Sequence, residues 1–259
     1  MAKAFANQGA NLVLLARRMN LLEQNAADIS REFGVEVLPF ACDITDTEMV
    51  KSAVKATMER FGRVDILVNN AGTGAVAPAE EITDEQFKHE LDIDLFGTFV
   101  CAREFGKEMI KAGYGRVINI ASMYGLVGNM IAGSSPYHAA KGGVVNLTRA
   151  LAAEWGKHGI TVNSICPGYF YTELTTATLD SDYFQSIAKQ NIPLGRYGRE
   201  GELNTCALFL ASPMSTYVNG QNIAVDGGYT TWHSGSKLAK YQEQKGAFEI
   251  DYLKEYSSK

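Results

Sequence analysis

Short apolar segments alternate with longer segments of helical periodicity along most of the chain. The apolar segments are hydrophobic at both odd and even positions, which is typical of strands in a parallel sheet that is covered on both faces. They lie at residues 11–16, 36–44, 64–70, 115–122, 160–168 and 221–227. The alternation of strand and helix predicts an α/β fold, with a Rossmann-like, doubly wound parallel sheet in a single domain.

Two predicted helices begin with a capping sequence. Thr45-x-x-Glu48 and Thr83-x-x-Gln86 both match the capping box. In that motif the Thr hydroxyl and the third following side chain bond backbone N–H groups that have no partner within the helix. We therefore expect helices to start at these two threonines.

Both ends of the chain depart from the alternation. Residues 1–8 resemble the last two turns of a helix that Gly9 closes, and no strand is encoded before it. We therefore expect the sheet to lack its first strand. By typical element lengths, about 15–20 residues that would form this strand, its loop and the first helical turn are missing, as when an internal Met is taken as the start. Residues 1–230 then form the domain. Residues 231–259 form a polar extension, either helical over a neighbouring subunit or disordered.

Composition and charge exclude several classes of protein. The 259 residues are 46% hydrophobic and 20% charged, which fits a globular domain with a sizeable core. A net charge of −5 gives no field to attract nucleic acid or a membrane surface. The chain has no apolar run of transmembrane length and no signal-peptide profile. The 4 cysteines and 4 histidines are scattered. We therefore expect a cytoplasmic protein with neither disulfide bonds nor a metal site.

The strongest chemical signal is the pair Tyr137 and Lys141. A spacing of four residues puts both side chains on one face of a helix, expected at 137–155. An ammonium group near a phenol favours the phenolate and lowers its pKa toward neutral pH, which suits a general acid/base. The spacing alone is weak evidence, because Tyr241 and Lys245 repeat it in the polar tail.

Several further motifs accompany this pair, and together they resemble the classical short-chain dehydrogenase/reductase family over residues 1–230. Each follows a predicted strand or opens a predicted helix, in the order and at the spacing of that family. They are Asn69-Asn70-Ala71-Gly72, Asn119-Ile120-Ala121-Ser122, Tyr137-His138-Ala139-Ala140-Lys141, Pro167-Gly168 and Val225-Asp226-Gly227-Gly228.

The resemblance implies a catalytic role for each of four residues. Tyr137 would exchange a proton with the carbonyl or alcohol oxygen, and Ser122 would hydrogen-bond the same oxygen. Lys141 would lower the pKa of Tyr137 and hold the nicotinamide ribose. Asp94 stands where the family has an asparagine, which is a departure, because an ionised carboxylate accepts hydrogen bonds but does not donate them. Asp94 is either part of a proton relay or a residue held by a backbone contact.

The resemblance also implies a nicotinamide dinucleotide site. Asp43 would meet the adenine amino group beside Ile44, and small residues after the next strand would allow close backbone approach to the adenosine. An acidic ribose-reading residue is absent after residue 16, where Arg17 and Arg18 favour the 2′-phosphate of NADP over NAD. The glycine-rich turn for the pyrophosphate is not in the chain, and we expect this to impair folding or cofactor affinity. The other expected cofactor contacts are Asn70, Ala71, Gly72, Tyr137, Lys141, Pro167, Gly168, Phe170 and Thr172.

These features predict an NAD(P)-dependent oxidoreductase that interconverts a secondary alcohol and a ketone. Within the family the pattern is closest to gluconate 5-dehydrogenase-like and 3-oxoacyl-carrier-protein reductase-like members, and residues 92–95 favour a sugar acid or polyol as substrate. An oxoacyl or steroid-like alicyclic ketone remains an alternative. A non-catalytic binding or assembly module is an alternative of another class, supported by the missing phosphate loop. The resemblance also implies a homo-oligomer, a tetramer or dimer.

Overall fold

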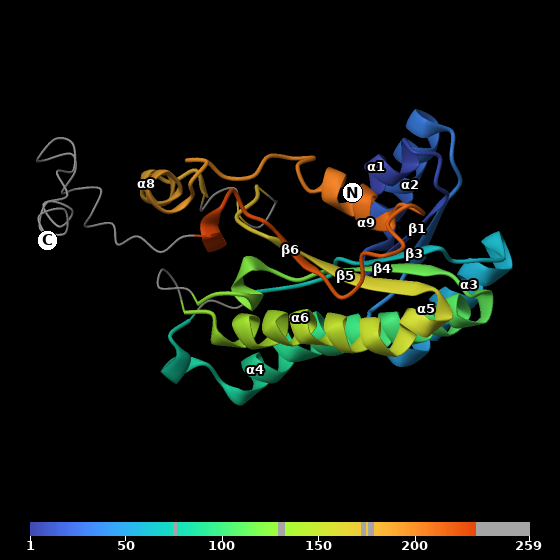
Figure 1. The fold of residues 1–259 in the computed structure, drawn as a ribbon, viewed down its shortest axis with the longest axis horizontal. Coiled ribbons are helices and arrows are strands. Elements are labelled where there is room, and N and C mark those ends of the chain that lie inside the picture. The colour runs from blue at the N-terminus through green and yellow to red at the C-terminus, as the bar shows by residue number, and fades with distance from the viewer. Residues whose placement is uncertain (75–76, 129–132, 172–174, 176–178, 232–259) are drawn as a thin grey trace, which may run out of the picture.

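The computed structural model describes residues 1–259 except 75–76, 129–132, 172–174, 176–178 and 232–259. Parallel strands lie between helices on both faces (Figure 1), so the predicted doubly wound α/β fold is confirmed. The strands are β1 (Leu12–Ala16), β2 (Val37–Ala41), β3 (Ile66–Asn69), β4 (Gly115–Ile120), β5 (Ile160–Pro167) and β6 (Asn222–Val225). The α-helices are α1 (Ala2–Ala6), α2 (Met19–Phe33), α3 (Thr47–Phe61), α4 (Asp84–Leu91), α5 (Thr98–Ala112), α6 (Ser135–Trp155), α8 (Asp182–Asn191) and α9 (Asn204–Ala211).

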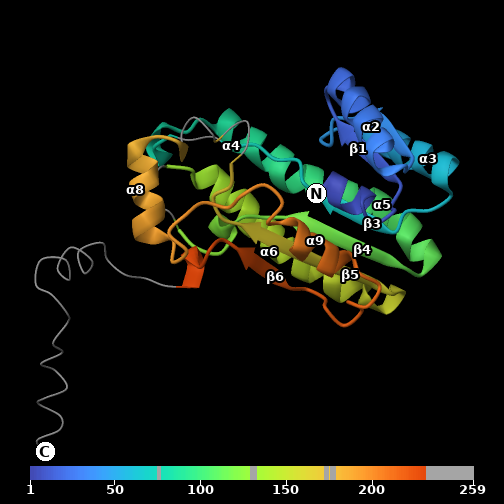
Figure 2. The same cartoon turned by 90° about the horizontal axis from the view of Figure 1, so that it is seen from above.

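The strands form two separate parallel sheets. β1 pairs with β2, and a second sheet has the order β3-β4-β5-β6. Among the described residues no strand pairing joins β1 to β3. This is the arrangement expected of a doubly wound sheet that lacks the strand between these two. Figure 2 shows the β1–β2 unit with α2 to one side of the four-stranded sheet.

Side chains, rather than strand hydrogen bonds, connect the two sheets. On one face, Leu15 of β1 and Phe40 of β2 pack against a core cluster that includes Leu67 of β3. On the other face, Leu12 of β1 packs with Ile66 of β3 in the cluster that contains α1 and α9 residues. Successive residues of a strand point to opposite faces, so the apolar runs supply both clusters at once. On each face of the protein, apolar side chains of the two sheets therefore pack in one cluster, although no strand hydrogen bonds join the sheets in the described structure.

One predicted helix start is confirmed and the other is wrong. Thr83 caps α4 with a complete capping box, because its hydroxyl accepts from Gln86 N while the Gln86 side chain accepts from Thr83 N. At α3 the cap is Asp46, whose carboxylate accepts from Glu48 N at 2.8 Å and Met49 N at 3.1 Å. The Thr45 hydroxyl instead donates to Asp43 at 2.7 Å. Thr45 is therefore committed to the turn before the helix.

A π-helical segment, Asp92–Gly97, continues α4 into α5. Such wide turns are rare and frequently occur at functional sites. Gly97 closes the segment where the chain passes Ile44, and a Cβ atom at position 97 would lie 2.6 Å from Ile44 Cδ1. The segment carries Asp94, which is fully buried. The backbone irregularity thus places a carboxylate inside the protein.

Replacing Asp46 by Ala tests the identity of the α3 cap. We expect Asp46→Ala to lower the free energy of unfolding by about 1 kcal/mol, because two backbone N–H groups lose their acceptor. Urea denaturation would measure the change. Asp46→Ser should retain most of the stability, and equal losses in the two variants would contradict the assignment.

Candidate active site

The motif residues converge at the carboxyl ends of three neighbouring parallel strands. Asn70, Ala71 and Gly72 follow β3, Ser122 lies two residues after β4, and Pro167 ends β5. β3 pairs with β4 and β4 pairs with β5 in parallel register, so their carboxyl ends share one edge. In open parallel sheets this edge is where ligands bind. The sequence motifs therefore meet at one place in space.

Lys141 of α6 lies at the centre of this edge. Its side chain is buried, with 4% of the residue exposed. The ammonium group donates a hydrogen bond to the Ile120 carbonyl at 3.1 Å and lies 3.5 Å from Asp94 Oδ2. It also lies 5.6 Å from the centroid of the Tyr137 ring. Lys141 thus connects α6, the end of β4 and the π-helical segment.

Tyr137 and Ser122 are brought together as predicted, but the pKa of Tyr137 is not lowered. Burial raises the pKa of the Tyr137 phenol to about 12, and the hydrogen bond with Ser122 opposes this increase only in part. The negative charges of Asp94 and Glu90 raise it further. In this structure burial therefore dominates the pKa of Tyr137, and the lowering by Lys141 that the sequence suggests stays a prediction. The phenol is protonated at neutral pH.

Asp94 is held by a backbone contact as well as by Lys141. Thr73 N donates to Asp94 Oδ1 at 2.8 Å. Burial raises the pKa of the Asp94 carboxyl, and the nearby Lys141 charge and the hydrogen bond from Thr73 oppose the rise. Gly72 packs directly on this pair, since a Cβ atom there would lie 3.0 Å from Asp94 Oδ1 and 3.3 Å from Lys141 Nζ. Both sequence readings of Asp94, a backbone contact and a position beside the relay residues, agree with this geometry.

Arg17, Arg18, Asp43 and Ile44, which are expected on the adenosine side, lie around β1 and β2. Arg17 and Arg18 are exposed immediately after β1. Asp43 follows β2, and its carboxylate already accepts from Thr45 N at 2.9 Å and from the Thr45 hydroxyl at 2.7 Å. These bonds lower the pKa of Asp43. Ile44 is half-buried against the core.

The residues expected near the nicotinamide lie beyond β5. Pro167 and Gly168 are half-buried, and Gly168 N donates to the Val225 carbonyl at 3.0 Å. Gly168 faces Asp226, whose Cα would be 2.7 Å from an added Cβ, so this close approach requires glycine. Phe170 forms a bridge with Gly198. Thr172 lies outside the described residues.

Two features of the site were not anticipated from the sequence. The first is Glu90, which is buried one turn before Asp94. The second is an aromatic cluster in which Tyr124 stacks on His138 and meets Tyr169 edge to face, and Tyr169 in turn contacts Tyr229. The Tyr124 and Tyr169 hydroxyls are hydrogen-bonded to each other. The only signal in the sequence is that each cluster member lies within two residues of a motif residue.

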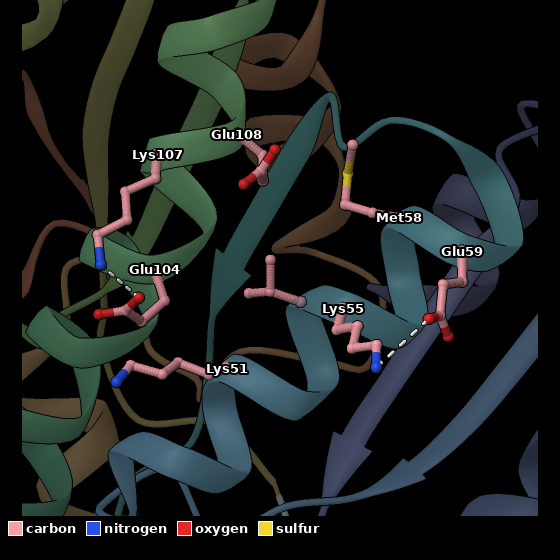
Figure 3. Close-up of a pocket in the computed structure, with 8 residues that line it drawn as sticks. Lys51, Lys55, Met58, Glu59, Glu104, Lys107 and Glu108 are labelled. Carbon is pink, nitrogen blue, oxygen red and sulfur yellow. Dashed lines mark hydrogen bonds and ion pairs between the residues drawn. The ribbon is translucent and has the colours of Figure 1, made fainter.

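A separate recess of about 530 Å³ lies between α3 and α5 (Figure 3). It is lined by Lys and Glu side chains that pair with one another, as in Lys107–Glu104 at 2.6 Å and Lys55–Glu59 at 3.7 Å. None of the motif residues lines it. Its balanced charges and its position make it a surface groove apart from the candidate site.

The described residues contain neither a metal-ligand cluster nor a membrane-spanning helix. No group of His, Cys, Asp or Glu side chains has the arrangement of a metal site there. No helix in the described part of the chain is long and apolar enough to cross a membrane. The four cysteines are free thiols.

Comparison with known proteins gives consistent similarities over most of the chain. A sequence model described as enoyl-(acyl carrier protein) reductase matches residues 1–230. Galactitol 2-dehydrogenase (L-tagatose-forming) of Cereibacter sphaeroides is 38% identical over 90% of each chain. D-threitol dehydrogenase of Mycolicibacterium smegmatis is 38% identical, covering 89% of this chain and 87% of its own. The crystal structure of a gluconate 5-dehydrogenase from Burkholderia cenocepacia in complex with NADP and tartrate is 34% identical over 90% of each chain, with a TM-score of 0.85.

The raised pKa of Tyr137 predicts a loss of stability in alkali. The unfolded phenol ionises near its ordinary pKa of 10 and the folded one near 12, so the unfolded state binds fewer protons between these values. The contribution is present below about pH 10 and is lost as the pH rises through 12, by about 3 kcal/mol in total. Urea unfolding at several pH values would show a shallower decline for Tyr137→Phe than for the parent. Replacement of the fully exposed Tyr217 by Phe is the control and should leave the decline unchanged.

Proposed function

Because the chain belongs to the short-chain dehydrogenase/reductase family, whose dehydrogenases act on CH–OH groups with NAD(P), we propose that it interconverts a secondary alcohol of a sugar acid or polyol with the corresponding ketone. The observation that carries this proposal is the set of buried Ser122 and Lys141 with half-buried Tyr137 at the carboxyl edge of β4, with Asp94 beside Lys141. We assign the reaction to this edge of the sheet and not to the recess between α3 and α5, because none of these residues lines the recess.

A nicotinamide dinucleotide would supply the hydride for reduction and accept it in oxidation. The residues present fit most of such a molecule. Lys141 would hold the nicotinamide ribose, whereas the exposed Asn70 and Ala71 and the Asp43 carboxylate would meet the adenosine side. Pro167 and Gly168, half-buried after β5, would meet the nicotinamide carboxamide. The described residues contain no glycine-rich turn for the pyrophosphate.

Tyr137 is the proton donor to the ketone oxygen in this proposal. Its high pKa keeps the phenol protonated at neutral pH, which is the form that reduction requires. Ser122, hydrogen-bonded to Tyr137, donates to the same substrate oxygen and stabilises the negative charge that develops on it. In oxidation the proton moves from the alcohol to Tyr137. Lys141 balances the charge in either direction from its buried position.

The aromatic cluster supports a polyhydroxylated substrate. Tyr124, Tyr169 and Tyr229 each follow a motif strand or turn, and the Tyr124 hydroxyl is hydrogen-bonded to the hydroxyls of the other two. Phenol hydroxyls both donate and accept hydrogen bonds, as do the hydroxyls of sugars and polyols. The similarity to galactitol and threitol dehydrogenases points the same way.

We further propose NADP as the preferred cofactor and a homo-oligomeric, cytoplasmic protein. Arg17 and Arg18 are exposed after β1 and suit a 2′-phosphate. Phe87 and Phe96 are 37% and 44% exposed beside α4 and α5, where a subunit contact would cover them. The free thiols fit a reducing compartment.

Tyr137→Phe tests the catalytic proposal. Removing the phenol hydroxyl should lower kcat by about 10²-fold or more, because proton transfer to the oxygen loses its donor. The measurement is nicotinamide absorbance during oxidation of galactitol, D-threitol and gluconate, with Tyr217→Phe as the control. Equal activity in the two variants would refute the role of Tyr137.

Removal of the two arginines tests the cofactor preference. The double variant Arg17→Ala/Arg18→Ala should bind NADPH about 10-fold more weakly, since a charge-assisted contact contributes about 1.5–3 kcal/mol. NADH affinity should stay unchanged. Nicotinamide fluorescence titration measures both, and Arg31→Ala, which breaks only a surface pair with Asp28, is the control. Equal weakening for both cofactors would contradict recognition of the 2′-phosphate.

A further inference from the structure

A second recess, of about 330 Å³, lies at the edge of the four-stranded sheet opposite the candidate active site. Its walls come from the amino ends of β4 and β5, from the turns just before them, and from the loop between α9 and β6. All the residues that line it belong to the described part of the chain, and Arg116 is the only one of them with a charged side chain. The recess therefore differs from the groove between α3 and α5, in which lysine and glutamate side chains balance one another.

Arg116 of β4 is a buried arginine without a carboxylate partner among the described residues. It is 2% exposed, and its Nη1 and Nε donate to the carbonyl groups of Gly115 at 2.9 Å and Ser212 at 3.4 Å. The guanidinium carbon lies 4.4 Å from the centroid of the Tyr114 ring, a contact with the face of the group that leaves its in-plane N–H donors available. Within the described structure Nη2 donates no hydrogen bond. A buried charge of this kind is costly unless an opposite charge accompanies it.

The ends of the neighbouring helices compensate this charge only weakly. Carbonyl groups at helix C-termini carry partial negative charge and are common partners of cations. Near the end of α6, however, the Ala152 carbonyl already accepts from Asn219 Nδ2 at 2.9 Å. At the end of α9 only the Ser212 carbonyl meets Arg116, at the long distance of 3.4 Å. The protein thus leaves most of the positive charge of Arg116 without a counter-charge.

Thr161 of β5 supplies an unsatisfied donor next to this cation. Arg116 and Thr161 are register partners on adjacent parallel strands, so their side chains project from the same face of the sheet. Thr161 is 5% exposed, and its hydroxyl has no hydrogen-bond partner in the described part of the chain. Both residues line the recess. A buried hydroxyl without a partner is unfavourable, and a ligand that accepts a hydrogen bond would remove this cost.

We propose that this recess binds the phosphate or carboxylate group of a small molecule, with Arg116 Nη2 and the Thr161 hydroxyl as donors. Oxygens of such groups accept charge-assisted hydrogen bonds from a guanidinium and also accept from a hydroxyl. The recess has room for the anionic group together with a few further atoms. The site goes beyond the proposed oxidoreduction, because it lies at the other edge of the sheet and shares no residue with the candidate active site.

Calorimetric titration of the full chain with inorganic phosphate tests this site. The titrations use the Arg17→Ala/Arg18→Ala chain, so that the arginines proposed for the 2′-phosphate do not contribute. We expect saturable binding in this background. Adding Arg116→Gln should abolish binding, because the charge is removed. Adding Thr161→Val should weaken binding about 10-fold, because one hydrogen bond to a charged acceptor is lost.

Thr57→Val is the matched control. Thr57 is also buried, with 3% exposed, but its hydroxyl donates to the Ala53 carbonyl at 2.8 Å and it does not line the recess. Its replacement should leave the phosphate affinity unchanged. Should Arg116→Gln not fold, as judged by circular dichroism, threonine methyl NMR of the background chain decides. Phosphate should then shift the Thr161 methyl signal with saturation and leave the Thr57 signal in place.

A second titration with acetate distinguishes the two kinds of anion, and the tighter binder identifies the group that the recess prefers. Failure of both anions to bind with saturation would overturn the proposal, as would equal affinities in Thr161→Val and its background chain. These measurements involve no turnover, so failure of the proposed reaction would leave them unaffected.

Discussion

The burial of a single ammonium group connects most of the candidate active site. Lys141 lies almost entirely out of water, and an uncompensated buried charge costs several kcal/mol. Its compensation comes from the Ile120 carbonyl at the end of β4 and from Asp94 in the π-helical segment. Position 72 then requires glycine, because a Cβ atom there would crowd both Asp94 and Lys141. One cation thus fixes the relative positions of α6, β4, the α4–α5 junction and the loop after β3.

The division of the sheet lies between the two parts of the proposed cofactor site. Arg17 and Asp43 follow strands of the β1–β2 sheet, whereas Ser122 and Pro167 belong to the β3–β6 sheet. Apolar side chains on both faces join the sheets, but backbone hydrogen bonds do not join them in the described structure. The edges of β1 and β3 therefore leave backbone groups without strand partners. A dinucleotide held as we propose would bridge these two parts.

The electrostatics of the site form one coupled unit. Burial raises the pKa of Tyr137 and keeps the phenol protonated at neutral pH, and the negative charges of Glu90 and Asp94 act in the same direction. Ser122 acts in the opposite direction through its hydrogen bond. The neighbouring tyrosines have hydroxyl groups that already satisfy one another, with the Tyr124 pKa raised by burial. The site thus combines a neutral proton donor with hydroxyl-rich surroundings, as expected for chemistry on a polyhydroxylated alcohol.

The sequence by itself determined the elements and the order in which their polar ends appear. Each β-strand of the structure lies within a predicted apolar segment, because the continuous hydrophobic runs needed to fill both core faces are a local property of the chain. The alignment of motifs at one sheet edge followed, since the carboxyl ends of parallel strands share that edge. The Thr83 capping box was also readable, because all of its partners lie within four residues.

Tertiary contacts decided the remaining features. Thr45 and Asp46 are both good helix caps, and the choice fell to Asp46 because Asp43 holds the Thr45 hydroxyl. The pKa of Tyr137 is raised because the phenol is buried, and its spacing from Lys141 in the sequence does not encode that burial. Glu90 looks like an ordinary helix residue in the sequence, and the packing of α4 on α6 buries it. Local patterns specify which groups a strand or helix carries, whereas charge balance and desolvation depend on neighbours that are distant in the chain.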